Sequence, residues 1–437
     1  MIRIILTCSL LLASTASVMA QQPLRLSQQD CRERAIAHSE DLQQANNAIQ
    51  QAKLDRKIAN TAYLPNLEGS ATGAYVLPDI DVMGSELRMR GMYMAGITLT
   101  QPIYTGGSIT TGRRLAQIGE KSAAEQERLT RMEVIADADN AYWTYIAVRR
   151  KVQMTGQYKR QMDTLYRQTQ TAVQAGMATD NDLLRIEAQR SNLAYQLQRA
   201  ENGADLCRMS LCRIIGVAAD TPILPTDTII QCAVPGTLDT NTTARPELRL
   251  LQMQIDANEQ QVRMNQSKLL PTVGLSAGYT YYGNIKMAGT ADAGNGTLIP
   301  YTQEFRDGIG MAMLAVQIPI FHWGEGHKKV RRAQYDLENA RLELQKNSRL
   351  LDLELQQAIR NVQDGYRLIT AADIALRQAE ENLRVMRNRY AASMSPLTDL
   401  LDAQSQWQEA SSNLIEAQTQ YKIYETEYLR AAGWLAD

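Results

Sequence analysis

Two carboxylates lie close together near the end of the chain, in the stretch SMSPLTDLLDAQ that covers residues 393–404. A helical pattern stops before Pro396 and starts again after it, and the new helix carries Asp399 and Asp402 three residues apart. Residues at this spacing share one helix face. Such a pair can attract cations, or it can simply be stabilised by the unpaired N–H groups of a helix N-terminus. Both interpretations stay open on these residues alone.

The rest of the chain offers no constellation typical of catalysis. The three histidines, His38, His322 and His327, include no pair four residues apart beside an acid. The sequence also lacks a nucleophile elbow, a P-loop and a dinucleotide fingerprint. We therefore expect no catalytic residue, no metal site, no cofactor and no enzymatic activity. A net charge of −1, with acids and bases interspersed, predicts no nucleic-acid surface.

The first residues predict a secretory signal peptide over 1–20. Arg3 precedes an apolar run that ends at Leu12, and Val18-Met19-Ala20 resembles a small-residue cleavage site. Cys8 lies inside the apolar run, so we expect no lipid attachment there. No later apolar stretch reaches the roughly 20 residues that a transmembrane helix needs. The mature chain is then either soluble outside the cytoplasm or crosses a membrane as strands.

The cysteines that follow the signal are too few for a disulfide scaffold. They are Cys31, Cys207, Cys212 and Cys232. A Cys212–Cys232 bridge suits an oxidising compartment, and free buried thiols suit the sequence equally well.

The sequence contains an internal duplication. At a shift of 217 residues, GMATDNDLLRIEAQ (176–189) aligns with SMSPLTDLLDAQSQ (393–406), and Gly216 aligns with Gly433. Before the first strand the shift is 206, because TAYLPNLEGSA (61–71) aligns with SKLLPTVGLSA (267–277). The difference places 11 extra residues in one variable loop of the second copy. Such internal repetition predicts two structurally similar halves.

Each copy predicts the same element order, namely a helix, two strands, a very long helix, a break and a shorter helix. We expect a first repeat over 21–216, an inter-repeat linker or equatorial segment over 217–244, and a second repeat over 245–437. The first repeat is expected to contain a helix at about 27–62, strands at about 66–78 and 91–104, a long helix at about 108–173, a tip at about 174–180 and a helix at about 180–215. The second is expected to contain a helix at about 246–269, strands at about 272–283 and 309–321, a long helix at about 326–391, a tip at about 391–397 and a helix at about 397–432.

The strand segments alternate between large apolar and small polar residues. Val273, Leu275 and Ala277 share one face, opposite Gly274 and Ser276. The alternation suits a membrane barrel and a half-buried soluble sheet equally well. Aromatic residues crowd these segments and favour the barrel, because barrels carry Tyr and Trp at the membrane interfaces. These aromatic residues are Tyr63, Tyr75, Tyr93, Tyr104, Tyr279, Tyr281, Tyr282, Tyr301, Phe305, Phe321 and Trp323. The polar, Gly-rich segments 79–90 and 283–308 are expected to be exposed hairpin loops.

The long helices carry a heptad seam, which predicts coiled-coil packing. In the second copy one row repeats every seven residues, and a second row follows at a four-residue offset. The first row is Val330, Leu337, Leu344, Leu351, Ala358, Gly365, Ala372, Ala379 and Met386, and the second is Leu355, Val362, Ile369, Leu376, Leu383 and Tyr390. A helix of about 65 residues is about 100 Å long, so we expect a rod of antiparallel helices with the strands at one end and the tips at the other. Four strands cannot close a barrel, which needs at least about 8, so several chains must share one.

Taken together, these features resemble the TolC family of outer membrane efflux proteins. The resemblance rests on YLPNL (63–67) and LLPTV (269–273) before strands, TQPIYTGG (100–107) and IPIFHWG (318–324) after strands, AGMATDNDLL (175–184) at the first tip and SMSPLTDLLDAQ (393–404) at the second. It implies a mainly α fold with a membrane β-barrel, in which four strands from each chain of a homotrimer form a shared 12-stranded barrel in outer-membrane lipid. A long α-helical tunnel extends from this barrel into the periplasm. The implied partners are a periplasmic adaptor (membrane fusion protein) and an inner-membrane pump.

The resemblance also assigns roles to individual residues. Asp399 and Asp402 match the acids that ring the periplasmic gate, and Tyr390 and Asp182 match residues that latch it. The adaptor-contacting tips match Gly176, Met177, Ala178, Ser393, Met394 and Ser395. Two positions depart from the family pattern.

Ser393 stands where a glycine is usual, and Ser395 stands where a latch arginine is usual. Arg185 and Arg389 are the candidates to replace that arginine. The expected function is a passive exit duct of a tripartite efflux pump or type I secretion system. The alternative is a periplasmic coiled-coil scaffold or adaptor without a barrel.

Overall fold

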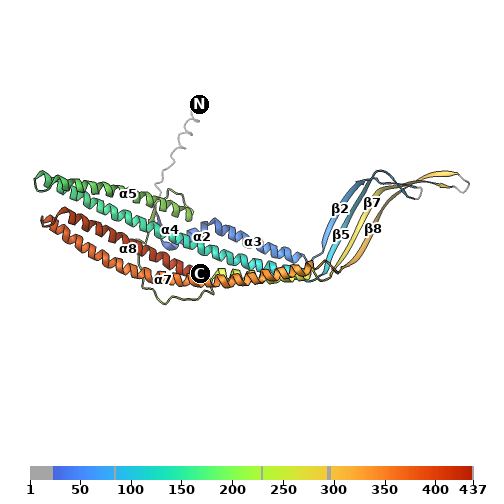
Figure 1. Ribbon diagram of the computed structural model, residues 1–437. Coiled ribbons are helices and arrows are strands. Elements are labelled where there is room, and N and C mark those ends of the chain that lie inside the picture. The colour runs from blue at the N-terminus through green and yellow to red at the C-terminus, as the bar shows by residue number, and fades with distance from the viewer. Residues whose placement is uncertain (1–22, 83–84, 228–229, 293–296, 436–437) are drawn as a thin grey trace, which may run out of the picture. The chain divides into compact units, whose positions relative to one another are not determined.

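The computed structural model describes residues 23–82, 85–227, 230–292 and 297–435. The predicted signal peptide, residues 1–20, lies outside them. Helices dominate the described chain (Figure 1). They are α2 (Gln28–His38), α3 (Glu40–Thr61), α4 (Ser108–Gln174), α5 (Asp180–Ile214), α6 (Pro246–Ser267), α7 (Glu325–Ala391) and α8 (Leu397–Ala432). No helix in the described ranges combines the length and the apolar character needed to cross a membrane.

The duplication is visible in the helix lengths. The long helices α4 and α7 contain 67 residues each, which corresponds to about 100 Å. The helices α3 and α6 contain 22 residues each and lie at the predicted shift. In contrast, α2 has no helical counterpart, because the matching stretch 234–244 contains neither helix nor strand.

The single helix predicted over about 27–62 is wrong, because the chain breaks at Ser39. Ser39 has φ −65° and ψ 120°, an extended conformation that ends α2. Its hydroxyl accepts a hydrogen bond from the N–H of Leu42 at 3.2 Å, so the same residue caps α3. Ser39 followed by Glu40 and Asp41 is a typical helix start, so the sequence itself carries the signal of this break.

Two compact units make up the chain, and neither follows the repeat boundaries. The helical unit contains the described residues up to 46, together with 125–248 and 346–437. The strand unit contains residues 47–124 and 249–345. Each unit therefore combines segments of both repeats.

The strand unit contains one antiparallel sheet of four long strands and two short ones (Figure 1). The long strands follow the order β2 (Asn66–Tyr75), β5 (Arg90–Thr105), β7 (Thr272–Asp292) and β8 (Leu298–Gln317). Cross-strand register places Leu99 opposite Ala277 and Leu275 opposite Leu314. Since directly opposite residues lie on the same side of a sheet, the predicted apolar face is confirmed.

Segments 79–90 and 283–308 are not the loops that we predicted. The first contains β3 (Ile80–Val82) and β4 (Ser85–Arg88), and the second is mostly a continuation of β7 and β8. A register shift between Tyr282 and Ile285 lets the ladder continue, so that Lys286 lies opposite Glu304. Gly289 and the polar residues around it interrupt the apolar alternation, so the composition resembles that of a loop.

One hydrophobic core of the helical unit lies between α2, α4 and α5. Its buried residues include Leu26, Cys31, Tyr142, Leu211 and Ile215. One part of this core, the parallel pair β1 (Leu24–Leu26) and β6 (Ile223–Pro225), was not predicted from the sequence. Each strand has only three residues, too few for a periodicity to appear.

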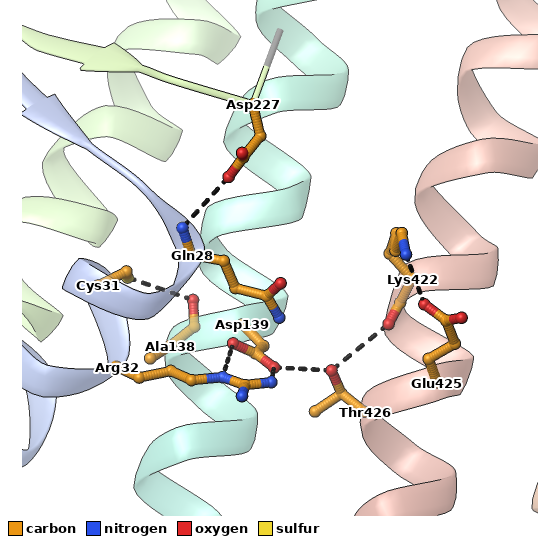
Figure 2. A network of polar contacts seen from close by, with 9 residues as sticks. All are labelled: Gln28, Cys31, Arg32, Ala138, Asp139, Asp227, Lys422, Glu425 and Thr426. Carbon is orange, nitrogen blue, oxygen red and sulfur yellow. Dashed lines mark hydrogen bonds and ion pairs between the residues drawn. The ribbon is translucent and has the colours of Figure 1, made fainter. Parts of the chain in front are cut away.

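A buried polar network joins three helices of the helical unit (Figure 2). Asp139 of α4 is fully buried and binds the guanidinium of Arg32 from α2. The hydroxyl of Thr426 from α8 donates a hydrogen bond to the same carboxylate at 2.7 Å. Buried charges are tolerated when they are paired and hydrogen-bonded, and this network fixes α2 against both α4 and α8.

The four cysteines are free thiols, so the structure contains no Cys212–Cys232 bridge. Cys31 and Cys212 are buried, whereas Cys207 and Cys232 are partly buried. The Cys31 thiol donates to the carbonyl of Ala138 at 3.7 Å. Burial and the nearby Asp139 carboxylate raise the pKa of the Cys31 thiol to about 12.

Candidate functional site

Two turns in the helical unit connect its helices in the same way. Residues 175–179 join α4 to α5, and residues 392–396 join α7 to α8. The N–H of Met177 donates to the carbonyl of Ala172, and the N–H of Met394 donates to that of Arg389, both at 2.8 Å. These bonds span five residues and are typical of a Schellman motif. We call the two turns, with the flanking residues 174–180 and 391–397, the first tip and the second tip.

The second tip adopts this geometry without a glycine. Gly176 has φ +70°, and Ser393, which replaces glycine at the equivalent position, has φ +56°. A left-handed conformation costs a residue with a Cβ about 1–2 kcal/mol. Ser393 therefore adopts, under strain, a backbone conformation that glycine adopts without this cost.

Asp182 and Asp399 are equivalent in the repeats but differ in their bonding. Asp182 closes a capping box, because its carboxylate accepts a 3.4 Å hydrogen bond from the N–H of Thr179 and its own N–H donates to the Thr179 hydroxyl at 3.2 Å. The Thr179 hydroxyl also donates to this carboxylate at 2.7 Å. At the second tip the N-cap residue is Pro396, and no side-chain capping bond forms. Helix capping thus engages the Asp182 carboxylate but leaves that of Asp399 available.

Asp399 and Asp402 are both exposed at the start of α8. Within the described residues, neither carboxylate has a hydrogen bond or an ion pair. Asp182 likewise forms no ion pair there with Arg185 or Arg389, the two expected substitutes for the latch arginine. The acids therefore lie together on one helix face without a cation from their own chain.

Tyr390 joins α7 to α4. Its hydroxyl lies 3.3 Å from the hydroxyl of Thr169, so α7 is held against α4 directly before the second tip. Thr169 is buried. Nearby, the guanidinium of Arg387 donates to the side-chain carbonyl of Gln161 at 3.2 Å. The resemblance predicted the role of Tyr390, whereas Thr169 and Gln161 are known only from the packing.

A hydrophobic cluster supports both tips from inside. It brings α4, α5, α7 and α8 together, and its buried members are Tyr158, Met162, Leu165, Ile186, Leu193, Leu383, Leu397, Leu400 and Ala403. The rings of Tyr158 and Trp407 meet edge to face at 6.3 Å. Because this cluster contains residues from all four helices, a shift of one helix pair disturbs the packing of the other.

A polar cavity of about 1100 Å³ lies beside this cluster. Gln157, Arg160 and Thr164 of α4 line one side, and Arg387 and Gln404 line the other. The side-chain oxygen of Gln404 is buried and has no protein partner. A cavity of this size and polarity can hold water that satisfies this oxygen.

The tips themselves expose apolar side chains. Met177 is 80% exposed and Met394 is 74% exposed. The residue at this position of a Schellman motif frequently packs against the preceding helix turn. Neither methionine is buried by such packing, so each tip presents a thioether to the solvent.

Comparison with known proteins places this architecture. The family model described as outer membrane efflux protein matches residues 31–216 and 239–433. The outer membrane protein TolC of Escherichia coli strain K12 is 24% identical over 356 residues, which cover 78% of this chain and 69% of TolC. The fold resembles the crystal structure of CusC, with a TM-score of 0.77, 14% identity and coverage of 93% of this chain and 92% of CusC. VceC of Vibrio cholerae gives a TM-score of 0.76 at 17% identity, with coverage of 93% of this chain and 96% of VceC.

The fold with its paired tips thus matches solved outer membrane proteins such as VceC. The chain belongs to the outer membrane efflux protein family, because the family model matches most of both repeats. Its place is the outer membrane, with its helical part in the periplasm.

Proposed function

We propose that three copies of this chain form one exit duct. The observation that carries the proposal is the pair of open sheet edges. Among the described strands, β2 and β8 each have a neighbour on one side only. Unpaired strand edges are not tolerated in lipid. Four long strands per chain are too few for a closed barrel, and three chains supply the 12 strands that the resemblance implies.

Exposed apolar residues on α5 support the same assembly. Leu184, Tyr195 and Leu206 are 62%, 67% and 68% exposed. They recur every 11 residues, and this period follows one line along a nearly straight helix. In the proposed trimer, a neighbouring copy covers these three side chains.

Asp399 and Asp402 form the selectivity ring of the periplasmic gate in this proposal. Three copies bring two carboxylates each to a common axis, where rings of acids attract cations and repel anions. The Tyr390–Thr169 contact holds α7 on α4 and keeps the gate narrow. Asp182 contributes indirectly, because its capping box stabilises the start of α5.

The proposed partners are a periplasmic adaptor and an inner-membrane pump. The adaptor contacts Gly176, Met177 and Ala178 at the first tip and the matching Ser393, Met394 and Ser395 at the second. The exposed methionines support this assignment, because they provide apolar surface where a partner can bury it. The duct itself is passive, and the pump supplies both the energy and the choice of cargo.

Single-channel conductance tests the duct and the ring together. The detergent-purified protein is inserted into a planar bilayer beside an Asp399→Ala/Asp402→Ala variant. We expect small cation-selective steps from the native protein and a loss of selectivity in the variant. Equal selectivity in both would overturn the ring and keep the duct. Well-folded protein without any channel would overturn the duct and favour a periplasmic scaffold.

A further inference from the structure

The two tips carry the same chemically vulnerable group in the same geometry. Met177 and Met394 occupy equivalent positions of the repeats, and their N–H groups make equivalent 2.8 Å bonds to the preceding helix. Their exposed fractions are 80% and 74%. By contrast, Met132 and Met162 of α4 are fully buried. The chain therefore contains its own reference methionines for a test of reactivity.

We propose that Met177 and Met394 are oxidation sites through which hypohalous acids switch off docking at the tips. The thioether reacts with hypochlorous acid to give methionine sulfoxide, a proton and chloride, so sulfur loses two electrons and chlorine gains them. The sulfoxide is polar, whereas the thioether is apolar. The covalent change is reversible, because methionine sulfoxide reductases restore the thioether.

The regulatory part of this inference rests on the proposed docking of an adaptor at the tips. Docking buries an apolar side chain at each tip, and a sulfoxide would carry a polar oxygen into that contact without a prepared partner. Burying an unpaired polar group is costly. Because both tips are modified in the same way, no tip retains the unmodified contact.

Peptide mapping decides the modification itself. The purified protein is treated with limiting hypochlorous acid, and sulfoxide formation is followed by mass spectrometry. We expect Met177 and Met394 to oxidise at least about tenfold faster than Met132 and Met162, since susceptibility follows exposure. Comparable rates at all four methionines would overturn the proposal, whatever the docking partner is.

Crosslinking in intact cells decides the consequence. Ala178→p-benzoyl-phenylalanine is introduced at the first tip, and the photo-adduct is identified by mass spectrometry before and after hypochlorous acid treatment. A Met177→Leu/Met394→Leu variant keeps the apolar surface but cannot form a sulfoxide, whereas Met177→Gln/Met394→Gln imitates the polar product. We expect the adduct to fall at least fivefold in treated native protein and in the untreated glutamine variant. In the leucine variant, the treatment should leave the adduct at that variant's own untreated level.

The possible failures are distinguishable. An adduct that persists in the glutamine variant or in fully oxidised native protein would overturn the switch and leave docking intact. The absence of an adaptor adduct in every sample, including untreated native protein, would overturn docking at the tips. The mapping experiment would then still decide whether the methionines are oxidation sites.

Discussion

The guanidinium of Arg32 donates two hydrogen bonds to the carboxylate of Asp139, from Nε to Oδ1 at 2.8 Å and from Nη2 to Oδ2 at 2.5 Å. Asp139 is fully buried, while a quarter of the Arg32 side chain remains exposed. The fork geometry of arginine matches a carboxylate in this way. Through this pair the short helix α2 holds the middle of α4 in place.

Arg32→Ala is expected to destabilise the protein by about 3–5 kcal/mol, because it leaves a buried carboxylate without its cation. The unfolding midpoint of the detergent-solubilised protein, followed by circular dichroism, measures the loss. The double variant Arg32→Ala/Asp139→Ala should be more stable than Arg32→Ala alone. If the double variant were the weaker of the two, the buried charge would not be the cause.

Ser393→Gly is expected to stabilise the second tip by about 1 kcal/mol, because glycine adopts the left-handed conformation without a Cβ clash. Hydrogen exchange of the amides around residues 390–396 provides the measurement, and exchange should slow. Gly176→Ala is the matched control at the first tip and should accelerate exchange there. Unchanged exchange in both variants would show that the left-handed residue does not limit tip opening.

Tyr390→Phe removes one hydroxyl and keeps the ring. We expect the channel to open more often, since the variant loses the 3.3 Å contact with Thr169 that holds α7 on α4. A side-chain hydrogen bond of this kind contributes about 1 kcal/mol, or about fivefold in an open–closed equilibrium. Planar-bilayer recordings report the open fraction. Adding Thr169→Val to Tyr390→Phe should produce little further change, and an additive effect would separate the two residues.

The Cys31 thiol gives the stability a defined pH dependence. Its pKa is raised from 9.0 to about 12 in the folded protein. The folded state thus binds the proton more tightly, so this contribution is complete below pH 9 and disappears as the pH rises towards 12. Between pH 9 and 11 the native protein should lose up to about 1.4 kcal/mol per pH unit more than Cys31→Ala. Parallel pH profiles of the two unfolding midpoints would contradict this account.

The elements that the sequence predicted best are those whose signal is long or doubled. The heptad rows of α7 predicted Leu355, Ala358 and Val362 as core residues, and each is at most 6% exposed. Alternation along β5, β7 and β8 predicted the faces of the sheet. The β1–β6 pair escaped, because three residues cannot establish a period. The break at Ser39 leaves the helical periodicity nearly unchanged, and only its capping signal indicates it.

At the tips, the sequence indicates where the acidic residues lie but not which hydrogen bonds they form. The resemblance located Asp182 and Asp399, yet only the structure shows that Thr179 engages Asp182 while Pro396 leaves Asp399 uncapped. The pattern Thr179-x-x-Asp182 is itself a capping signal that could have revealed this difference. The Thr169 contact with Tyr390 joins residues 221 positions apart, so no local pattern could indicate it.

The absence of a second α2 has a consequence for how the duct meets its partner. Two identical repeats in a trimer would form a pseudo-six-fold ring of equivalent binding sites for the adaptor. Here the first repeat has α2, Gly176 and a capped Asp182, whereas the second has the linker 234–244, Ser393 and an uncapped Asp399. The proposed trimer therefore presents two kinds of adaptor-binding site in alternation. If the adaptor binds both kinds of site, six copies bind each trimer with two different affinities. If the adaptor binds only one kind, three copies bind each trimer.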